Sequence, residues 1–404
     1  MEAYILDWLS LLGRWLHFVA GVAWIGASFY FVWLDDHLLA PKEAADNDKG
    51  VAGEVWSVHG GGFYHAQKYA LTPPEMPGTL HWFKWEAYTT WLSGAFLLAL
   101  IYWYGANVYL IDPRVANLTR PEAIGIGIGT LVVGWVVYDL LCRSPIGNNE
   151  KLLAACIFIF ASVMAFVLCH LFSGRGAFIH YGAMLGTIMV ANVAHVIIPG
   201  QKELVAAAKE GRKPDPAYGI KGKQRSVHNT YFTLPVLFVM ISNHYAMTYS
   251  HQYNWLILIA LSLAGALVRV YFVARHKGGA SPVPLIVAAL IVIALAAAIA
   301  PSSSSPGGST GAAAGFSRVE SIIARRCRPC HSKSPVQPGF ASAPKGLMLD
   351  DRQEILANKD RIYQQAVADK VMPLGNLTGM TDEERRILGG WYQNDAKASS
   401  GSGE

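Results

Sequence analysis

Residues 152–172 read LLAACIFIFASVMAFVLCHLF, an apolar stretch that carries no charged side chain. A helix of about 20 such residues spans the hydrocarbon core of a bilayer. Similar stretches recur up to about residue 300, and the whole chain is 52% hydrophobic and only 15% charged, which is typical of a membrane protein. We therefore predict eight transmembrane helices, at about residues 8–34, 85–104, 123–142, 152–172, 178–198, 230–250, 254–274 and 281–300.

The positions of lysine and arginine predict how these helices are oriented. An even number of spans puts both ends of the chain on one side of the membrane. The loops between spans on that side carry only Arg114, Arg120 and Arg175, whereas the opposite loops are rich in basic residues, most densely at 202–225. Because basic loops stay in the cytoplasm, we expect a periplasmic N-terminus in a bacterial inner membrane. The 202–225 cluster could also suit a nucleic acid, but orientation and contact with anionic lipids explain it better, so no nucleic-acid partner is expected.

Near the C-terminus, Cys327, Cys330 and His331 form the C-x-x-C-H motif that attaches a c-type haem. The two thiols form thioethers with the haem, and the histidine is placed to ligate the iron. Met372 precedes a proline in an expected loop and is the predicted sixth ligand, in preference to Met380, which lies beside a helix cap and suits packing. A His/Met pair raises the haem potential and suits an electron acceptor.

The sequence around this motif has the helix order of a class I cytochrome c. Thr381 and Glu384 predict a capping box, and Leu388 and Trp391 share a helix face that should pack on the haem. The predicted fold is all-α: an eight-helix transmembrane bundle plus a small class I cytochrome c-like domain. The predicted parts are a transmembrane domain at 1–300, a flexible Ser/Pro/Gly/Ala-rich linker at 301–315, and a cytochrome c domain at 316–404 with a disordered tail.

Histidines in or beside the spans are candidate ligands of one haem b, or of two. Ionisable residues within a membrane are functional candidates by default. Two pairs on neighbouring spans are 15 and 16 residues apart, which separates the members of each pair by roughly 22–24 Å, as in membrane cytochromes that stack two haems. For several of them, simple interfacial hydrogen bonding is the competing interpretation. The candidates are His17, His180, His195, His228 and His244.

Residues 56–91, between the first two spans, combine glycines, aromatic side chains and histidines. Three consecutive glycines let the backbone approach a ligand closely. Aromatic side chains can stack on a planar ring. The alternative is an interfacial aromatic belt, since Trp82, Trp85 and Trp91 lie where tryptophan is commonly enriched. The composition alone does not decide between a ligand site and an anchor.

The segment His59–Tyr64 (HGGGFY), the segment Leu80–Gly94 (LHWFKWEAYTTWLSG) and the C-terminal haem motif resemble the membrane-bound, cytochrome-c-fused urate oxidases of bacteria. The resemblance covers essentially the whole chain. It implies oxidation of urate to 5-hydroxyisourate. It also implies that electrons pass to the attached cytochrome and onward to a soluble cytochrome c or a terminal oxidase, without hydrogen peroxide.

The resemblance does not say which residues bind urate, so we assign them from chemistry. A planar anion that loses two electrons needs a cation, an aromatic wall and a proton acceptor. The predicted residues are His59, His65 and His81 for proton transfer, Glu86 as a proton acceptor or ion partner, Lys84 for the anion, Gly60, Gly61 and Gly62 for backbone approach, and Phe63, Tyr64 and Trp82 for stacking.

An inner substrate site would lie about 30 Å from an outer haem, the thickness of the hydrocarbon core, and would need a cofactor between them. Otherwise the urate site lies toward the outer face, near His17, His170, His180, His244 and His251. A competing function is a quinol–cytochrome c electron-transfer protein without urate chemistry. A transporter is the weakest alternative, because the spans are mostly continuous. The sequence predicts no oligomeric state.

Overall fold

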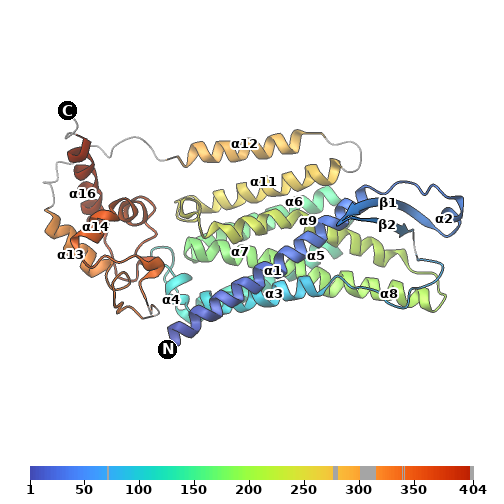
Figure 1. The fold of residues 1–404 in the computed structure, drawn as a ribbon, viewed down its shortest axis with the longest axis horizontal. Helices are drawn as coiled ribbons and strands as arrows, with labels where there is room; N and C mark the ends of the chain where they lie inside the picture. The colour runs from blue at the N-terminus through green and yellow to red at the C-terminus, as the bar shows by residue number, and fades with distance from the viewer. Residues whose placement is uncertain (71, 276–280, 301–314, 339, 341, 401–404) are drawn as a thin grey trace.

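The computed structural model describes residues 1–70, 72–275, 281–300, 315–338, 340 and 342–400. Long helices lie side by side in a bundle, with a small helical domain at one end (Figure 1). The bundle consists of α1 (Glu2–Asp36), α3 (Trp85–Leu97) continued by η1 (Leu98–Trp103), α5 (Arg120–Arg143), α6 (Glu150–Leu171), α7 (Gly174–Asn192) continued by η3 (Val193–Ile197) and α8 (Ile198–Lys209), α9 (Pro216–Ser242), α11 (Asn254–Arg275) and α12 (Val283–Ala298).

Within the described residues, five helices are long and apolar enough to cross a membrane: Tyr4–Asp36, Arg120–Arg143, Glu150–Leu171, Gly174–Lys209 and Asn254–Arg275. This finding identifies a membrane protein. The other predicted spans correspond to α3 with η1, to α9 and to the shorter apolar helix α12. Crossing by these three remains part of the proposal of eight spans.

Polar caps begin several of these helices, because the first turn of a helix leaves backbone N–H groups without partners. Thr119 and Glu122 form a capping box before α5. The side chain of Asn149 accepts the Leu152 N–H at the start of α6, and Ser173 accepts the Gly176 N–H at the start of α7. Asp215 caps α9, whose first residue is Pro216.

The start of α9 corrects the predicted sixth span. That span was expected at 230–250, whereas the helix runs from Pro216 to Ser242 and a separate turn, α10 (Ala246–Tyr249), follows. Proline is favoured at the first helical position, where its missing N–H costs nothing. Much of the basic 202–225 segment is therefore helical, and His244 lies beyond the end of the helix.

A two-stranded antiparallel hairpin corrects the all-α prediction. Its strands are β1 (Val51–His59) and β2 (Gly62–Tyr69), preceded by the short helix α2 (Ala44–Asp48). The turn residues Gly60 and Gly61 have φ of 58° and 80°, which a two-residue hairpin loop requires and glycine adopts freely. The glycine run thus makes a turn at the tip of an exposed hairpin. The rest of the chain is mostly helical, as predicted.

The two ends of the bundle carry different structures. The hairpin and α8 lie at one end, and the N-terminus, α4 (Ala106–Tyr109) and the C-terminal domain lie at the other (Figure 1). The C-terminal domain packs around its own core of Val319, Ile322, Ile323, Leu349, Ile355, Ile362, Ala366, Met380, Leu388 and Trp391. Its helices are α13 (Phe316–Arg326), α14 (Arg352–Ala357), α15 (Lys359–Ile362) and α16 (Asp382–Ser400). The predicted linker falls almost entirely on residues outside the described part, as does the end of the predicted disordered tail, at 401–404.

Helix α7 is the centre of the bundle, and small residues let its neighbours approach closely. A Cβ added at Gly182 would lie 2.6 Å from Cγ1 of Val239 on α9, and Val239 is buried. Gly186, one turn further along α7, has open space around its ideal Cβ position. The two glycines of one helix therefore face different surroundings.

We predict that Gly182→Leu destabilises the bundle, because the added side chain must push a buried, stiff valine away from α7. Overpacking of this kind costs about 1–3 kcal/mol. Thermal unfolding in detergent should show a clear drop in Tm for Gly182→Leu, with Gly186→Leu as the matched control. Equal effects of the two substitutions would show that the α7–α9 contact is not the cause.

Candidate functional site

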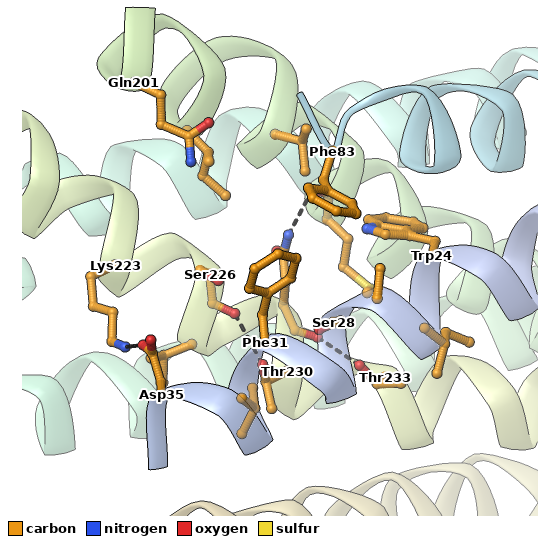
Figure 2. A pocket seen from close by; sticks show the side chains of 18 of the residues that line it. Trp24, Ser28, Phe31, Asp35, Phe83, Gln201, Lys223, Ser226, Thr230 and Thr233 are labelled. Carbon is orange, nitrogen blue, oxygen red and sulfur yellow. Dashed lines mark hydrogen bonds and ion pairs between the residues drawn. The ribbon is translucent and has the colours of Figure 1, made fainter. Parts of the chain in front are cut away.

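A cavity of about 510 Å³ lies between α1, α9, the η3–α8 segment and the residues before α3 (Figure 2). One part of its wall is aromatic, and another carries hydroxyl and amide groups. Cavities of this size hold small molecules. The lining includes Trp24, Phe31, His81, Trp82 and Phe83, together with Ser28, Gln201, Ser226, Asn229, Thr230 and Thr233.

A cluster of charges marks the rim of the cavity. Asp35 pairs with Lys223 of α9 at 2.6 Å and with Lys68 of β2 at 2.7 Å. Lys223 points at Asp35 beside the cavity in Figure 2. Because one carboxylate holds both lysines, the hairpin is linked to the cavity entrance. Exposed ion pairs of this kind contribute little stability but fix a local charge.

Asn229 is the lining residue whose orientation is fixed most firmly. Its Oδ1 accepts a hydrogen bond from Asn192 Nδ2 at 2.8 Å, and its Nδ2 donates to the carbonyl oxygen of Met189 at 3.0 Å. Asn192 also donates to the hydroxyl of Tyr138 at 3.0 Å. A carboxamide has two N–H donors and two acceptor lone pairs, so one of each stays available to a ligand.

The network continues through buried charged and aromatic residues. Arg225 donates to Asn192 Oδ1 at 3.4 Å and to Asp139 Oδ1 at 2.7 Å, and its guanidinium lies 4.9 Å from the ring centre of Tyr138. His228 Nδ1 is hydrogen-bonded to the Tyr138 hydroxyl at 2.8 Å. Fully paired polar networks rigidify a protein interior. This one joins α5, α7 and α9 behind the cavity.

The structure brings only part of the predicted urate site to this cavity. His81 and Trp82 line it, together with Phe83, which the sequence analysis did not select. Lys84 lies at the start of α3 with its ammonium 5.7 Å from the ring centre of Trp85, and Glu86 follows in the first turn. Neither residue is among the cavity lining.

The hairpin residues lie apart from the cavity. His59, Gly60, Gly61 and Gly62 form the turn, and Phe63 and Tyr64 are exposed. His65 stacks on Trp56 with ring centres 4.3 Å apart and bonds to Glu54 at 2.8 Å. Exposed aromatic side chains of this kind fit the interfacial-anchor interpretation better than a ligand site.

Sequence reasoning missed Trp24, Ser28, Asn229, Thr230 and Thr233. A signal was available for the last three, since residues three and four apart are neighbours on a helix surface and Thr233 follows Thr230 and Asn229 by three and four residues. Their positions on α9 make a polar stripe at the start of its apolar second half. The stripe faces the cavity.

Comparison with known proteins identifies the family of the bundle. A family model described as "Urate oxidase N-terminal" matches residues 3–300. The chain belongs to the urate oxidase N-terminal family. The match includes every residue of the cavity lining and ends just before the predicted linker. Searches of curated proteins and of solved structures give no match.

The candidate haem b ligands of the urate oxidase N-terminal domain differ in their surroundings, and one or two haems b stay a prediction. His180 is buried, its Nδ1 donates to the carbonyl oxygen of Gly176 at 2.9 Å, and its Nε2 accepts from Trp103 at 3.2 Å. A Cβ added at Gly127 would lie 2.8 Å from that Nε2, so α5 packs against the ring. Both ring nitrogens are occupied, and His180 does not fit an iron ligand.

The other candidates are scattered. His228 bonds to Tyr138, His195 is exposed near Trp135, and His244 is exposed in the turn after α9. His17 Nδ1 donates to the Thr90 carbonyl oxygen at 2.9 Å, and its Nε2 has no hydrogen-bond partner among the described residues. Haem-ligating histidines share this pattern, so ligation by His17 stays a prediction. No group of three or more histidine, cysteine or acidic residues in the described part of the chain could hold a metal ion.

The C-x-x-C-H segment follows α13 directly. Cys327 caps that helix, and the N–H of His331 donates to the carbonyl oxygen of Cys327 at 2.8 Å. His331 Nδ1 donates to the carbonyl oxygen of Leu347 at 3.0 Å, which fixes the ring and leaves Nε2 for a metal. Cys327 and Met372 pack against the domain core, whereas Met380 is buried within it. These residues fit a covalent haem ligated by His331 and Met372.

Glu384 anchors α16 to this segment. It completes the predicted capping box, because its carboxylate accepts the Thr381 N–H at 2.9 Å and its own N–H donates to Thr381 Oγ1 at 3.2 Å. Arg326 Nε, at the end of α13, lies 3.0 and 3.1 Å from the two carboxylate oxygens. Burial acts to raise the pKa of Glu384, but the hydrogen bonds from Thr381 and Arg326 outweigh it and lower that pKa.

This shift predicts an acid-sensitive domain. A carboxyl with a lowered folded-state pKa contributes stability above its unfolded pKa, near 4.3, and loses it as the pH falls through the folded value. Glu384→Gln should lower the free energy of unfolding by about 1–3 kcal/mol at pH 7. The Tm of this variant should therefore fall less than the wild-type Tm as the pH is lowered from 7 to 3. Thermal unfolding at pH 3–7 tests this. Glu383→Gln is the control, since Glu383 is exposed and pairs with exposed Arg386; matching curves for the two variants would contradict the prediction.

Proposed function

We propose that the protein is a membrane-bound urate oxidase that binds urate in the cavity between α1 and α9 and delivers electrons to a haem c in its own C-terminal domain. The observation that carries the proposal is the family match over residues 3–300, which includes all elements of the cavity. The product is 5-hydroxyisourate. The final acceptor is a soluble cytochrome c or a terminal oxidase, and hydrogen peroxide is not formed.

The chemistry of the lining supports a planar, anionic purine. Trp24, Phe31 and Phe83 supply aromatic surface on which a bicyclic ring can stack. Asn229 can donate to and accept from the alternating N–H and C=O groups at the edge of urate, and it is held in place before the ligand arrives. Such preorganisation reduces the entropy lost on binding. Lys223 at the rim is the lysine of the lining, and it is paired with Asp35.

The overall reaction is balanced as follows. The urate monoanion and one water give neutral 5-hydroxyisourate, two electrons and one proton, as oxygen from water becomes bonded to C5. We assign His81, which lines the cavity and is exposed, to accept the proton and release it to solvent. A c-type haem accepts one electron at a time, so it must be reoxidised by the external acceptor between the two transfers.

The cavity lies toward the hairpin end of the bundle, because its α1 lining runs from Trp24 to Asp36. The C-terminal domain lies at the other end (Figure 1). The cavity lining of α1 begins at Trp24, which at 1.5 Å per residue is about 33 Å from Glu2 along the helix. In the orientation predicted from the basic loops, urate enters from the cytoplasm and the haem domain is periplasmic. We propose this orientation in a bacterial inner membrane, with eight spans. Because the distance requires a cofactor between urate and haem c, the proposal includes a haem b in the bundle, for which His17 stays the predicted ligand.

An anaerobic optical difference spectrum tests the redox function directly. Adding urate to the oxidised, purified protein should produce the bands of reduced haem c without oxygen. Ascorbate provides the positive control for a reducible haem. Reduction by ascorbate but not by urate would overturn the proposal and make quinol the next donor to test.

The position of the site is tested by Asn229→Ala. We expect kcat/KM for urate to fall about 100-fold, a loss of about 3 kcal/mol, because the substitution removes the oriented carboxamide and its hydrogen bonds to the ligand. Gln224→Ala is the matched control on α9, since Gln224 bonds to Glu150 and Gly147 outside the cavity. Unchanged kinetics for Asn229→Ala would move the urate site elsewhere.

A further inference from the structure

The C-terminal domain touches the bundle through the loop that carries Met372. The short turn η6 (Leu374–Asn376) follows Met372 and lies against α4 at the end of the bundle. Val371, just before Met372, packs against the apolar core of the bundle. The predicted haem-ligand loop is therefore also the contact surface between the two parts of the chain.

Gly375 is the point of closest approach. A Cβ added there would lie 3.1 Å from the carbonyl oxygen of Val108 and 3.6 Å from those of Asn107 and Ile111. These carbonyls end α4 and its following turn. Gly375 has φ of 57°, a left-handed conformation that glycine adopts freely. Its backbone thus rests on the end of α4 with no room for a side chain.

Charged residues surround this contact. Asp112 follows α4 and is held by Arg114 through two side-chain bonds of 2.7 and 3.0 Å. Burial acts to raise the pKa of Asp112, but the bonds from Arg114 and the positive charge of Arg385 lower it. Arg385, buried in the C-terminal domain, donates to the carbonyl oxygen of Met372 at 2.8 Å. The charge of Asp112 on the bundle is thus felt by the arginine that holds the Met372 backbone.

We propose that this contact is the dock through which electrons leave the membrane bundle, and that Gly375 is the positioning residue that holds the Met372 side of the haem site against α4. The inference rests on the proposed function and adds the place of transfer. In the step itself one electron would pass from a reduced haem b in the bundle, for which His17 stays the predicted ligand, to the ferric haem c. The haem b would become ferric and the haem c ferrous, and no proton or bond would change place.

The test compares Gly375→Asn with Gly379→Asn. Asparagine tolerates the left-handed conformation, so backbone strain is small in both variants. Gly379 has φ of 66°, but a Cβ there would meet only Arg326 Nη1, at 3.6 Å, and no atom of the bundle. The pair therefore separates loss of space at α4 from general disturbance of the loop.

Two measurements apply to both variants. In anaerobic stopped flow, urate should reduce the haem at least 10-fold more slowly in Gly375→Asn than in wild type and at the wild-type rate in Gly379→Asn, while ascorbate reduces all three equally. Hydrogen exchange of the oxidised protein without urate should show faster exchange at residues 106–111 and 371–376 in Gly375→Asn alone.

The two measurements distinguish failure of the electron dock, of the positioning role of Gly375 and of the proposed function. Faster exchange in Gly375→Asn with an unchanged rate of haem reduction by urate would overturn the dock. Unchanged exchange would overturn the positioning role of Gly375. Absence of haem reduction by urate in the wild type would overturn the proposed function and the electron dock with it, while hydrogen exchange would still decide whether Gly375 holds the two parts of the chain together.

Discussion

The hydrogen bonds of Asn192 are the constraint on which the centre of the bundle depends. This buried side chain binds Tyr138 of α5, Asn229 of α9 and Arg225 of α9 at the same time. In a membrane interior no bulk water replaces a lost partner, so such groups must be satisfied by one another. The relative positions of α5, α7 and α9 follow from this requirement together with close contacts such as that of Gly182 with Val239. Because α9 is fixed in this way, the cavity wall that it forms is rigid as well.

Much of the fold could be predicted because it rests on local signals. Apolar runs of membrane length gave the positions of most long helices, and the Thr381–Glu384 pair marked the start of α16. The hairpin was missed because its signal, Gly60–Gly61 between short strands, was interpreted as a ligand loop. The first turns of α9 were missed because they are too polar for a span, although Asp215 and Pro216 mark a helix start.

The candidate site was predicted less well, for a physical reason. Its walls come from segments far apart in sequence, such as Trp24, His81 and Asn229, which only packing brings together. The sequence analysis searched one continuous segment and therefore found His81 and Trp82 but assigned the exposed hairpin as well. The histidine spacing was also misleading, since the environment of His180 is already complete through Gly176 and Trp103. Spacing along a helix does not show whether a ring nitrogen is free.

The cavity lies toward the hairpin end of the bundle, whereas the C-terminal domain lies at the other end (Figure 1). This separation has an energetic consequence. In the proposed orientation, every electron taken from urate crosses from the negative to the positive side of an energised membrane. Each elementary charge moved this way gains about 2.3 kcal/mol per 100 mV of membrane potential. The potential would therefore pull the electrons outward and favour purine oxidation. The same electron flow would lower the membrane potential slightly. Part of the energy stored in that potential would therefore drive the oxidation of urate.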